Sequence, residues 1–272
     1  MQVKGKVALV LGAVKGIGKG IGIALANEGA ELVLTRHDWK DAFERMEKDF
    51  SASAAEHMII TADLRRIKDI EMLALSIKEK YGSLDILVNN IERGGWPTVH
   101  GEYVEDQWDL EIETTLKAKQ WVFSSVFPLL KKAREAVVIN ISSIAGIVGR
   151  SGPAALVFND GYAAANRGVS SLTETWARLG APNIRVNEIM LGMFDTRHAK
   201  DTRGWSQVLT KEEKQSLIDH TLLKRTGTIE DAVKACLFLI KDAPYMTGSV
   251  LRLDGGYVLA GENIPPMPKG IV

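Results

Sequence analysis

The sequence is poor in the residues that build disulfides or metal centres. Its 272 residues include one cysteine, Cys236, which excludes an internal disulfide and any cluster of cysteine ligands. The histidines stand at no metal-ligand spacing. We therefore expect no metal site and a fold that depends on a hydrophobic core, which a chain of this length can build.

The sequence also lacks an excess of charge and any long apolar run. Its 34 basic and 34 acidic side chains give a formal net charge of +0, which argues against a nucleic-acid or membrane surface. No run approaches the roughly 20 apolar residues that span a bilayer, and the first residues show no apolar segment typical of a secretory signal. We expect a cytoplasmic protein that acts on a small molecule.

Short aliphatic runs alternate with amphipathic stretches along the whole chain. The runs predict strands at Val7–Leu11, Leu32–Leu34, Met58–Ile60, Asp85–Val88, Ala136–Ile141, Ile184–Ile189 and Val250–Leu253. The stretches predict helices at Ile17–Glu28, Asp41–Asp49, Ile67–Lys80, Asp106–Lys132, Tyr162–Leu179 and Glu230–Lys241. Because the strands are almost continuously aliphatic, both faces of the sheet should be covered, as in a doubly wound parallel sheet.

The chain shows no linker, repeat or low-complexity tract. We therefore interpret residues 1–261 as one domain. Residues 262–272 contain Pro265, Pro266 and Pro268, and we expect them to form an extended tail because proline does not continue a helix.

A glycine-rich turn follows the first predicted strand. Gly12, Gly16 and Gly18 have the spacing Gly-x-x-x-Gly-x-Gly, which permits a tight turn and close backbone approach. The helix that opens at Ile17 would offer its N–H groups and the positive end of its dipole to a pyrophosphate. The glycines could instead only pack the helix on the strand, but the strand–turn–helix context favours a nucleotide.

With these features the chain resembles the short-chain dehydrogenase/reductase family over about residues 4–261. The resemblance rests on ordered motifs: the glycine turn, Ala62-Asp63-Leu64, Asp85–Asn90, Asn140–Ser143, a helix led by Tyr162, Arg225-Thr226-Gly227 and Tyr245–Gly256. It implies a Rossmann-type sheet of seven strands and hydride transfer between a nicotinamide cofactor and a carbonyl or alcohol carbon. It also implies a homotetramer or homodimer, with a hetero-oligomer containing a paralogue as the alternative.

The end of the second strand carries Arg36 where NAD-binding folds have an acid that binds the ribose 2′-hydroxyl. Lys15 precedes the second glycine of the turn. Two cations can pair a 2′-phosphate, so we expect NADP(H) rather than NAD(H), unless both side chains are merely solvated. The resemblance also implies that Asp63 binds the adenine amino group, although Asp63 could instead cap the next helix. The other cofactor contacts that the resemblance implies are Leu64, Asn89, Gly192 and Thr196.

One motif argues against cofactor binding. Ile91 and Glu92 follow Asn89-Asn90 where the family has Ala-Gly, and they add bulk and a negative charge beside a polyanionic ligand. A cleft that binds no cofactor therefore remains an alternative.

The catalytic residues that the resemblance implies are incomplete. Ser143 would hold the substrate oxygen and Tyr162 would be the acid/base, unless Ser143 only caps a turn and Tyr162 only packs against a loop. The family lysine is replaced by Asn166, and Thr115 stands where an Asn supports a proton-relay water. A phenol titrates near pH 10 and needs a nearby cation to act near neutrality. Arg93 or Arg150, on loops near the cleft, could supply it.

Two functions follow from this pattern. The first is an NADP(H)-dependent oxidoreductase with a divergent site that acts on a carbonyl or hydroxyl substrate. Residues 193–219 would form its substrate lid, and the apolar Phe194 beside the basic Arg197 and His198 suits an acyl thioester. The second is a catalytically inactive family member that serves as a structural or regulatory subunit, beside an active paralogue. The replaced lysine and the roughly six-residue lengthening around Ser151–Asp160 favour the second.

Overall fold

The protein is described by a computed structural model covering residues 1–53, 55–91, 105–196 and 209–260. A parallel sheet of seven strands forms its centre, in the order β3-β2-β1-β4-β5-β6-β7. The strands are β1 (Val7–Val10), β2 (Glu31–Arg36), β3 (His57–Thr61), β4 (Ile86–Asn89), β5 (Ala136–Ser143), β6 (Ile184–Leu191) and β7 (Val250–Leu253). This confirms the predicted Rossmann-type sheet. The strand order reverses between β1 and β4, and ligands of such sheets bind at the carboxyl ends of the strands at that point.

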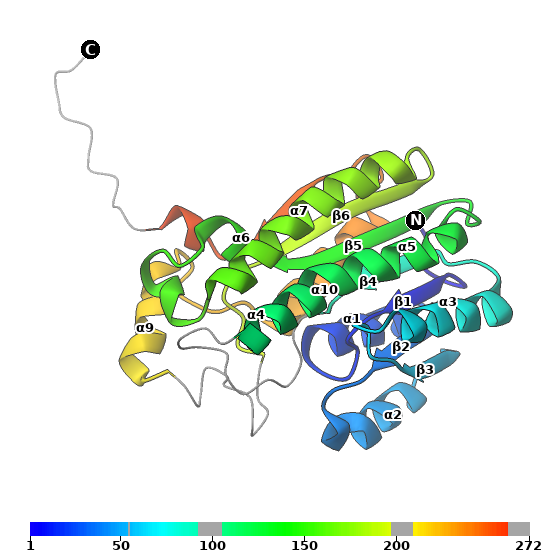
Figure 1. Ribbon diagram of the computed structural model, residues 1–272, viewed down its shortest axis with the longest axis horizontal. Coiled ribbons are helices and arrows are strands. Elements are labelled where there is room, and N and C mark those ends of the chain that lie inside the picture. Colours follow the sequence, from blue (N-terminus) through cyan, green and yellow to red (C-terminus); the bar gives the residue numbers. More distant parts are fainter. Residues whose placement is uncertain (54, 92–104, 197–208, 261–272) are drawn as a thin grey trace, which may run out of the picture.

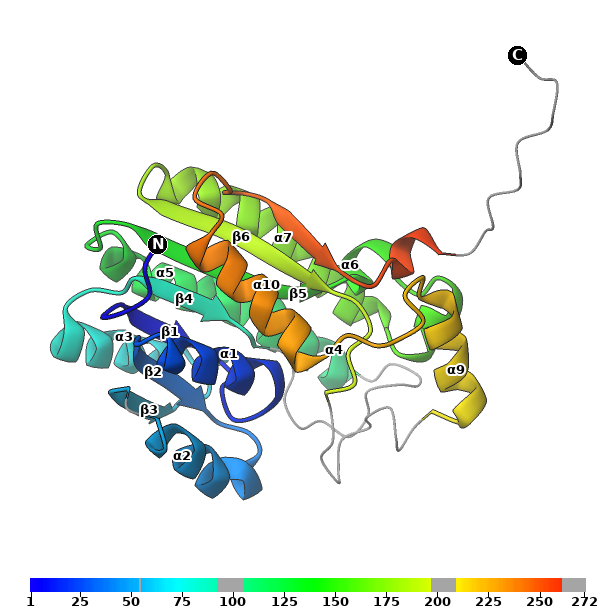
Figure 2. The ribbon, with the colours of Figure 1, turned by 180° about the vertical axis from the view of Figure 1, so that it is seen from behind.

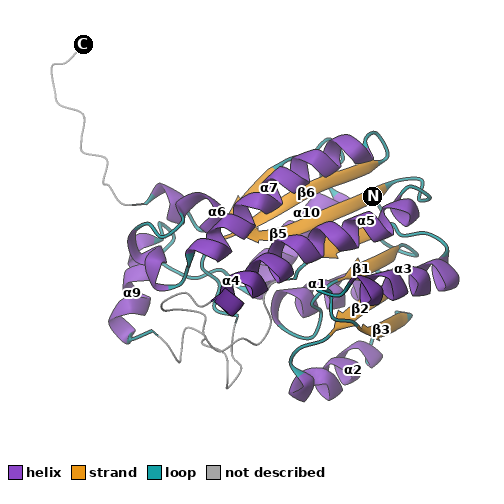
Figure 3. Ribbon diagram, viewed as in Figure 1, coloured by secondary structure: helices purple, strands orange, loops and turns teal. Residues whose placement is uncertain are grey.

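Helices cover both faces of the sheet (Figure 3). One face carries α1 (Gly16–Asn27), α2 (Phe43–Ser51) and α10 (Ile229–Lys241), and the other carries α3 (Ile67–Tyr81), α5 (Ala118–Leu130) and α7 (Asp160–Gly180), as the two opposite views show (Figures 1 and 2). Each layer of helices buries its own apolar cluster against the sheet. Burial on both sides explains why the strands are almost continuously aliphatic.

The predicted helix Asp106–Lys132 is not one regular α-helix. It consists of α4 (Glu105–Glu111), a π-helical segment η2 (Ile112–Lys117) and α5, which contains Pro128 near its end. A π-helical turn holds more residues than an α-turn, and such turns occur frequently at functional sites. Side chains that follow η2 are therefore rotated relative to the register that an ideal α-helix would give.

The segment between β5 and α7, where the lengthening around Ser151–Asp160 is expected, forms short helices: α6 (Ala145–Val148) and the 3-10 helix η3 (Gly152–Leu156). Another helix, α9 (Lys211–His220), lies within the predicted lid and begins with a capping box. These segments meet in a third apolar cluster that contains Ile144, Ala154, Phe158, Met193, Leu217 and Tyr257.

Three short elements complete the description: η1 (Lys40–Ala42), which precedes α2 in the predicted helix Asp41–Asp49, η4 (Tyr257–Leu259), and an isolated bridge from Phe194 to Gly227. The rest of the predicted lid (197–208) and the predicted tail (262–272) lie outside the described residues. Within the described ranges, no helix is both long and apolar enough to cross a membrane.

Candidate functional site

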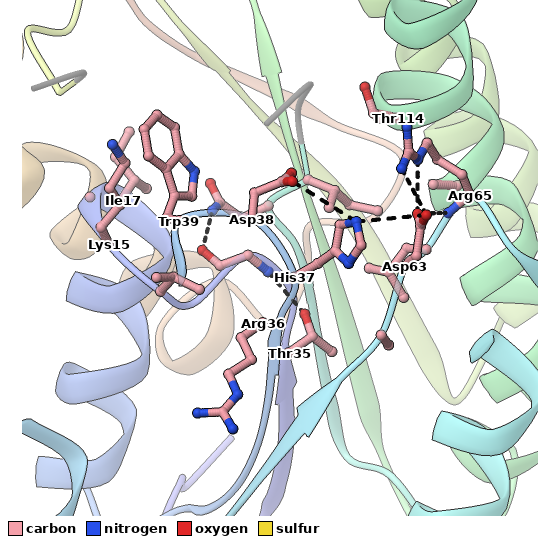
Figure 4. A pocket seen from close by; sticks show the side chains of 18 of the residues that line it. Lys15, Ile17, Thr35, Arg36, His37, Asp38, Trp39, Asp63, Arg65 and Thr114 are labelled. Atoms are coloured by element: carbon pink, nitrogen blue, oxygen red, sulfur yellow. Dashed lines mark hydrogen bonds and ion pairs between the residues drawn. The ribbon is translucent and has the colours of Figure 1, made fainter. Parts of the chain in front are cut away.

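A cavity of about 460 Å³ opens at the carboxyl ends of β1, β2 and β4, where the strand order reverses. Its walls come from the glycine turn, the end of β2, the segment between β3 and α3, the end of β4 and one face of α4–η2–α5 (Figure 4). The lining includes eight of the predicted cofactor contacts: Gly12, Lys15, Gly16, Ile17, Arg36, Asp63, Leu64 and Thr196. The structure thus brings together residues from four distant segments.

The glycine turn is packed so tightly that side chains cannot enter it. A Cβ at Gly12, where φ is +66°, would lie 2.3 Å from the Asn90 carbonyl oxygen, and one at Gly18 would lie 2.3 Å from the Gly12 carbonyl oxygen. Gly16 also has a positive φ, of +60°, but it is less closely packed. A Cβ at Gly16 would lie 4.0 Å from the nearest atoms, which belong to Thr196. Gly12 and Gly18 therefore set the turn, while the space beside Gly16 stays open to the cavity.

Helix α1 starts at the glycine turn, beside Gly16, without a side-chain cap. Its N-cap residue, Lys15, is extended (φ −155°) and makes no capping hydrogen bond, and the first turn holds no acidic residue. The N–H groups of a first helical turn lack intrahelical acceptors. Together with the helix dipole they suit an anion such as a pyrophosphate, so the residues present fit the phosphates of a dinucleotide.

The two cations predicted to select NADP(H) have different surroundings. The Lys15 ammonium lies 3.0 Å from the centroid of the Trp39 ring, and Trp39 has a left-handed backbone (φ 65°). The Arg36 guanidinium points away from Lys15 (Figure 4). It pairs with the Glu47 carboxylate, donates to the Thr61 hydroxyl at 3.0 Å and covers the ring of Phe43. In this conformation Arg36 borders the cavity with its charge already paired.

Asp63 is held by the residue two positions later. Its carboxylate accepts from the Arg65 guanidinium at 2.8 and 2.7 Å and from the Arg65 backbone N–H at 3.1 Å. The hydrogen bond from Arg65 holds the pKa of Asp63 below its usual value. The alternative role as a helix cap is wrong, because α3 has Arg66 at its N-cap. A carboxylate has about four lone-pair sites, so Asp63 can still accept from an adenine amino group.

Asn89, a predicted cofactor contact, does not line the cavity. It is fully buried in the sheet, and its amide donates to the Asn140 side chain at 2.8 Å. Asn90 lines the cavity instead, and its amide reaches the Gly12 carbonyl at 3.4 Å. Successive residues of a strand point to opposite faces, and this alternation is the signal that separates the two.

Two predicted contacts lie near the end of β6. Gly192 is required by packing, because a Cβ there would lie 2.6 Å from Cα of Asp254. Thr196 lines the cavity beside Gly16. Gly192 thus shapes the chain that carries Thr196 and does not itself border the cavity.

Ser143 and Tyr162 lie at the carboxyl end of β5 and in the first turn of α7. Ser143 is buried, and its hydroxyl accepts from the Ala145 N–H at 3.1 Å. The Tyr162 ring packs on Phe158, with centroids 5.8 Å apart, and its N–H donates to the Asn159 cap at 2.8 Å. Both residues therefore also make the structural contacts that their alternative roles predict.

Asn166 is buried, and its amide donates to the Tyr162 carbonyl at 2.9 Å, so this amide is bonded to its own helix. The Thr115 hydroxyl is buried and has no hydrogen-bond partner among the described residues.

Arg93, one suggested substitute cation, lies outside the described residues, and Arg150 is exposed. The sequence analysis missed Lys119, which is 1% exposed and donates to the Ile91 and Thr115 carbonyls at 2.6 and 3.0 Å.

The sheet, the cavity at its switch point and the uncapped helix over a glycine turn define a dinucleotide-binding fold of the kind found in oxidoreductases. Comparison with known proteins gives the family. Residues 12–258 match the family model described as enoyl-(acyl carrier protein) reductase. The chain therefore belongs to the short-chain dehydrogenase/reductase family.

Its relatives include enzymes that are named for different substrates. The chain is 31% identical to the 3-oxoacyl-[acyl-carrier-protein] reductase FabG of Thermotoga maritima over 265 residues, 95% of this chain and 100% of the relative. It is 31% identical to the 1,6-dihydroxycyclohexa-2,4-diene-1-carboxylate dehydrogenase of Acinetobacter baylyi over 260 residues, 92% of this chain and 95% of the relative. Among solved structures, a candidate short-chain alcohol dehydrogenase from Sinorhizobium meliloti superposes with a TM-score of 0.80 at 28% identity, covering 94% of this chain and 98% of the other.

Proposed function

We propose that this protein is an NADPH-dependent reductase of a carbonyl group in an acyl thioester or a similar anionic substrate. The observation that carries the proposal is the open first turn of α1 at the cavity, flanked by Lys15. Bound NADPH would supply a hydride for the carbonyl carbon. Tyr162 would give its phenolic proton to the carbonyl oxygen, and Ser143 would hold that oxygen through its hydroxyl.

The preference for NADPH rests on Lys15 and Arg36. Glu47, the partner of Arg36, has a side chain that is 53% exposed, and exposed ion pairs stabilise a protein by at most about 1 kcal/mol. A 2′-phosphate can therefore displace Glu47 at little cost. Lys15 stands at the same end of the cavity, next to Trp39.

The substrate class rests on chemistry shared by the relatives. One relative is named as a reductase of a 3-oxoacyl group and another as a dehydrogenase of a dihydroxy carboxylate. Both names describe oxidation or reduction at a carbon that bears oxygen, in an acidic or thioester-linked molecule. A 3-oxoacyl thioester with a short acyl chain is therefore the first substrate to test.

A second candidate is an inactive subunit that works beside an active paralogue. It is favoured by Asn166, whose amide is bonded to its own helix and carries no charge that could act on Tyr162. In either case we propose assembly through the α4–α5 face, where Trp121 is 38% exposed. Size-exclusion chromatography with light scattering tests that assembly.

Calorimetric titration with NADPH and NADH tests the proposed function first. NADPH should bind in the micromolar range and more tightly than NADH. Reduction of acetoacetyl-CoA should then consume NADPH in the wild type and not in Tyr162→Phe. Binding of neither cofactor would leave the inactive subunit as the better account. NADPH binding without turnover of any thioester or hydroxy acid would reject only the proposed reaction.

A further inference from the structure

Helices α4 and α5, with η2 between them, present a row of buried polar side chains to the interior. Glu111, Thr115 and Lys119 follow one another at four-residue spacing, and each is at most 1% exposed. The neighbouring row, Leu110, Thr114 and Ala118, lines the cavity. The buried row is therefore one helical position behind the cavity wall.

Three contacts fix how α7 lies along this helical segment. The Asn159 amide donates to the Glu111 carboxylate at 2.8 Å, at the start of α7. A Cβ at Gly168 would lie 2.9 Å from the Leu116 side chain, so the two helices approach closely there. The Trp176 indole donates to the Gln120 side chain at 3.3 Å. The turn from Tyr162 to Asn166 therefore lies at the level between Glu111 and Leu116, beside Thr115.

The Lys119 ammonium reaches back to this level. It donates hydrogen bonds to the carbonyl oxygen of Thr115, four residues earlier, and to that of Ile91. Ile91 is one of the residues that line the cavity. Its ammonium is thus one hydrogen bond behind the cavity wall and at the level of the turn that carries Tyr162. Ammonium groups are seldom buried to this degree, so the depth at which Lys119 lies is unusual.

We propose that Lys119 supplies, from α5, the positive charge that the family places four residues after its tyrosine and that Asn166 cannot provide. This inference rests on the proposed function, since it deepens the account of the same site. Lys119 acts on the tyrosine through its electric field and on the cavity wall through Ile91, so it is a positioning residue. A nearby cation favours the ionised form of a phenol.

Among the residues that the structure describes, three elements bring charged groups towards Lys119. Glu188, on β6, is buried, and its carboxylate accepts from Ser142 and from Ser170, the latter at 3.0 Å. The charges of Lys119 and of Arg167, on α7, both act to lower the pKa of Glu188, although burial leaves it raised overall. Glu111, on α4, is held by Asn159. Arg167 is therefore the competing source of positive charge and the natural control.

The test follows the titration of Tyr162 itself, which needs neither substrate nor turnover. The full-length protein carries ring-labelled tyrosine, and the Tyr162 signal is assigned by comparison with Tyr162→Phe. In the wild type the Tyr162 titration midpoint should lie below the ordinary value of about 10. Lys119→Met should raise that midpoint by about one pH unit or more, whereas Arg167→Gln should move it less.

Activity and rescue give the second readout. With acetoacetyl-CoA and NADPH near neutral pH, Lys119→Met should reduce kcat about tenfold, the change that one unit in midpoint implies, with a smaller effect on KM. Adding Asn166→Lys to Lys119→Met should restore both kcat and the midpoint. Lys117→Met, which alters an exposed lysine paired with Glu113, should change neither.

The proposal is overturned if the wild-type midpoint lies at or above the ordinary value, a result that stands even if Lys119→Met fails to fold. It is also overturned if folded Lys119→Met keeps the wild-type midpoint, or if Arg167→Gln causes the larger shift. If the wild type binds NADPH but reduces nothing, the proposed reaction fails while the titration still decides the role of Lys119.

Discussion

The ion pair between Arg36 and Glu47 predicts that substitutions of its two members change the affinity for NADPH in opposite directions. Removing the guanidinium with Arg36→Ala should weaken binding of NADPH but not of NADH. Removing the competing carboxylate with Glu47→Gln should strengthen binding of NADPH alone. Both follow if the 2′-phosphate takes the place of Glu47 on Arg36.

The magnitudes follow from the exposure of the pair. A hydrogen bond to a charged group contributes about 1.5–3 kcal/mol, so Arg36→Ala should raise the Kd for NADPH by roughly 10- to 150-fold. The Glu47 side chain is 53% exposed, and such pairs contribute about 0–1 kcal/mol. Glu47→Gln should therefore lower the Kd for NADPH by no more than about fivefold. Neither change should alter the Kd for NADH by more than about twofold.

Calorimetry with both cofactors at constant salt measures these values, because surface charges are screened by salt. Asp41→Asn, on the exposed 3-10 turn before α2, is the matched control for loss of a nearby negative charge. Equal effects of Arg36→Ala on NADPH and NADH would refute the reasoning, as would stronger NADH binding in Glu47→Gln.

Three further predictions follow from particular contacts. Gly18→Ala should abolish NADPH binding, because its Cβ would meet a backbone carbonyl. Gly20→Ala should keep NADPH binding, because its Cβ would meet only the side chains of Ile229 and Val233. Calorimetry measures both affinities, and an equal loss of affinity in the two variants would contradict the prediction. The pKa of Asp231 is lowered mainly by the hydrogen bond from Arg225, so this carboxylate stabilises the fold above its unfolded pKa of about 4 and loses that effect as the pH falls. Asp231→Asn should therefore lower the stability by up to about 1 kcal/mol at pH 7 and by nothing in strong acid, as measured by urea unfolding. Burial raises the pKa of Glu188, so ionisation of this carboxyl destabilises the fold as the pH rises. Glu188→Gln should therefore be as stable as the wild type in acid and more stable than the wild type in alkali. A difference in stability that stays constant across the pH range would contradict this prediction.

The sequence predicted the sheet well because its central strands are buried on both faces. The strand β5 is buried along its whole length, and its first four residues, Ala136–Ile139, are all aliphatic, a signal that does not depend on tertiary detail. The cofactor turn was equally predictable, because Gly12 and Gly18 are required by contacts with backbone atoms. Such requirements leave a fixed spacing of one residue type in the sequence.

What the sequence could not supply were the partners of individual side chains. Nothing local to Arg36 shows that Glu47, eleven residues later, lies across from it. The π-helical segment η2 also has no signal in hydrophobic periodicity, and it lies between the Glu111 and Lys119 ends of the buried row. The sequence suggests Arg93 and Arg150, both in predicted loops, as substitute cations. The structure shows a buried cation, Lys119, inside α5, and the sequence of this helix has the pattern of an ordinary amphipathic helix.

The proposed site has two ends, one for the cofactor phosphates and one for the reaction, and they would depend on different atoms of the chain. The end proposed for the phosphates is a turn set by main-chain contacts at Gly12 and Gly18, so it should tolerate the loss of distant side chains. The end proposed for the reaction would depend on the side chains of Ser143 and Tyr162 and on a charge to support them. On this proposal, the absence of a lysine at the position of Asn166 would alter turnover while leaving cofactor affinity intact. Affinity for NADPH and reduction of a substrate must therefore be measured separately, since binding alone does not distinguish an enzyme from a silent subunit.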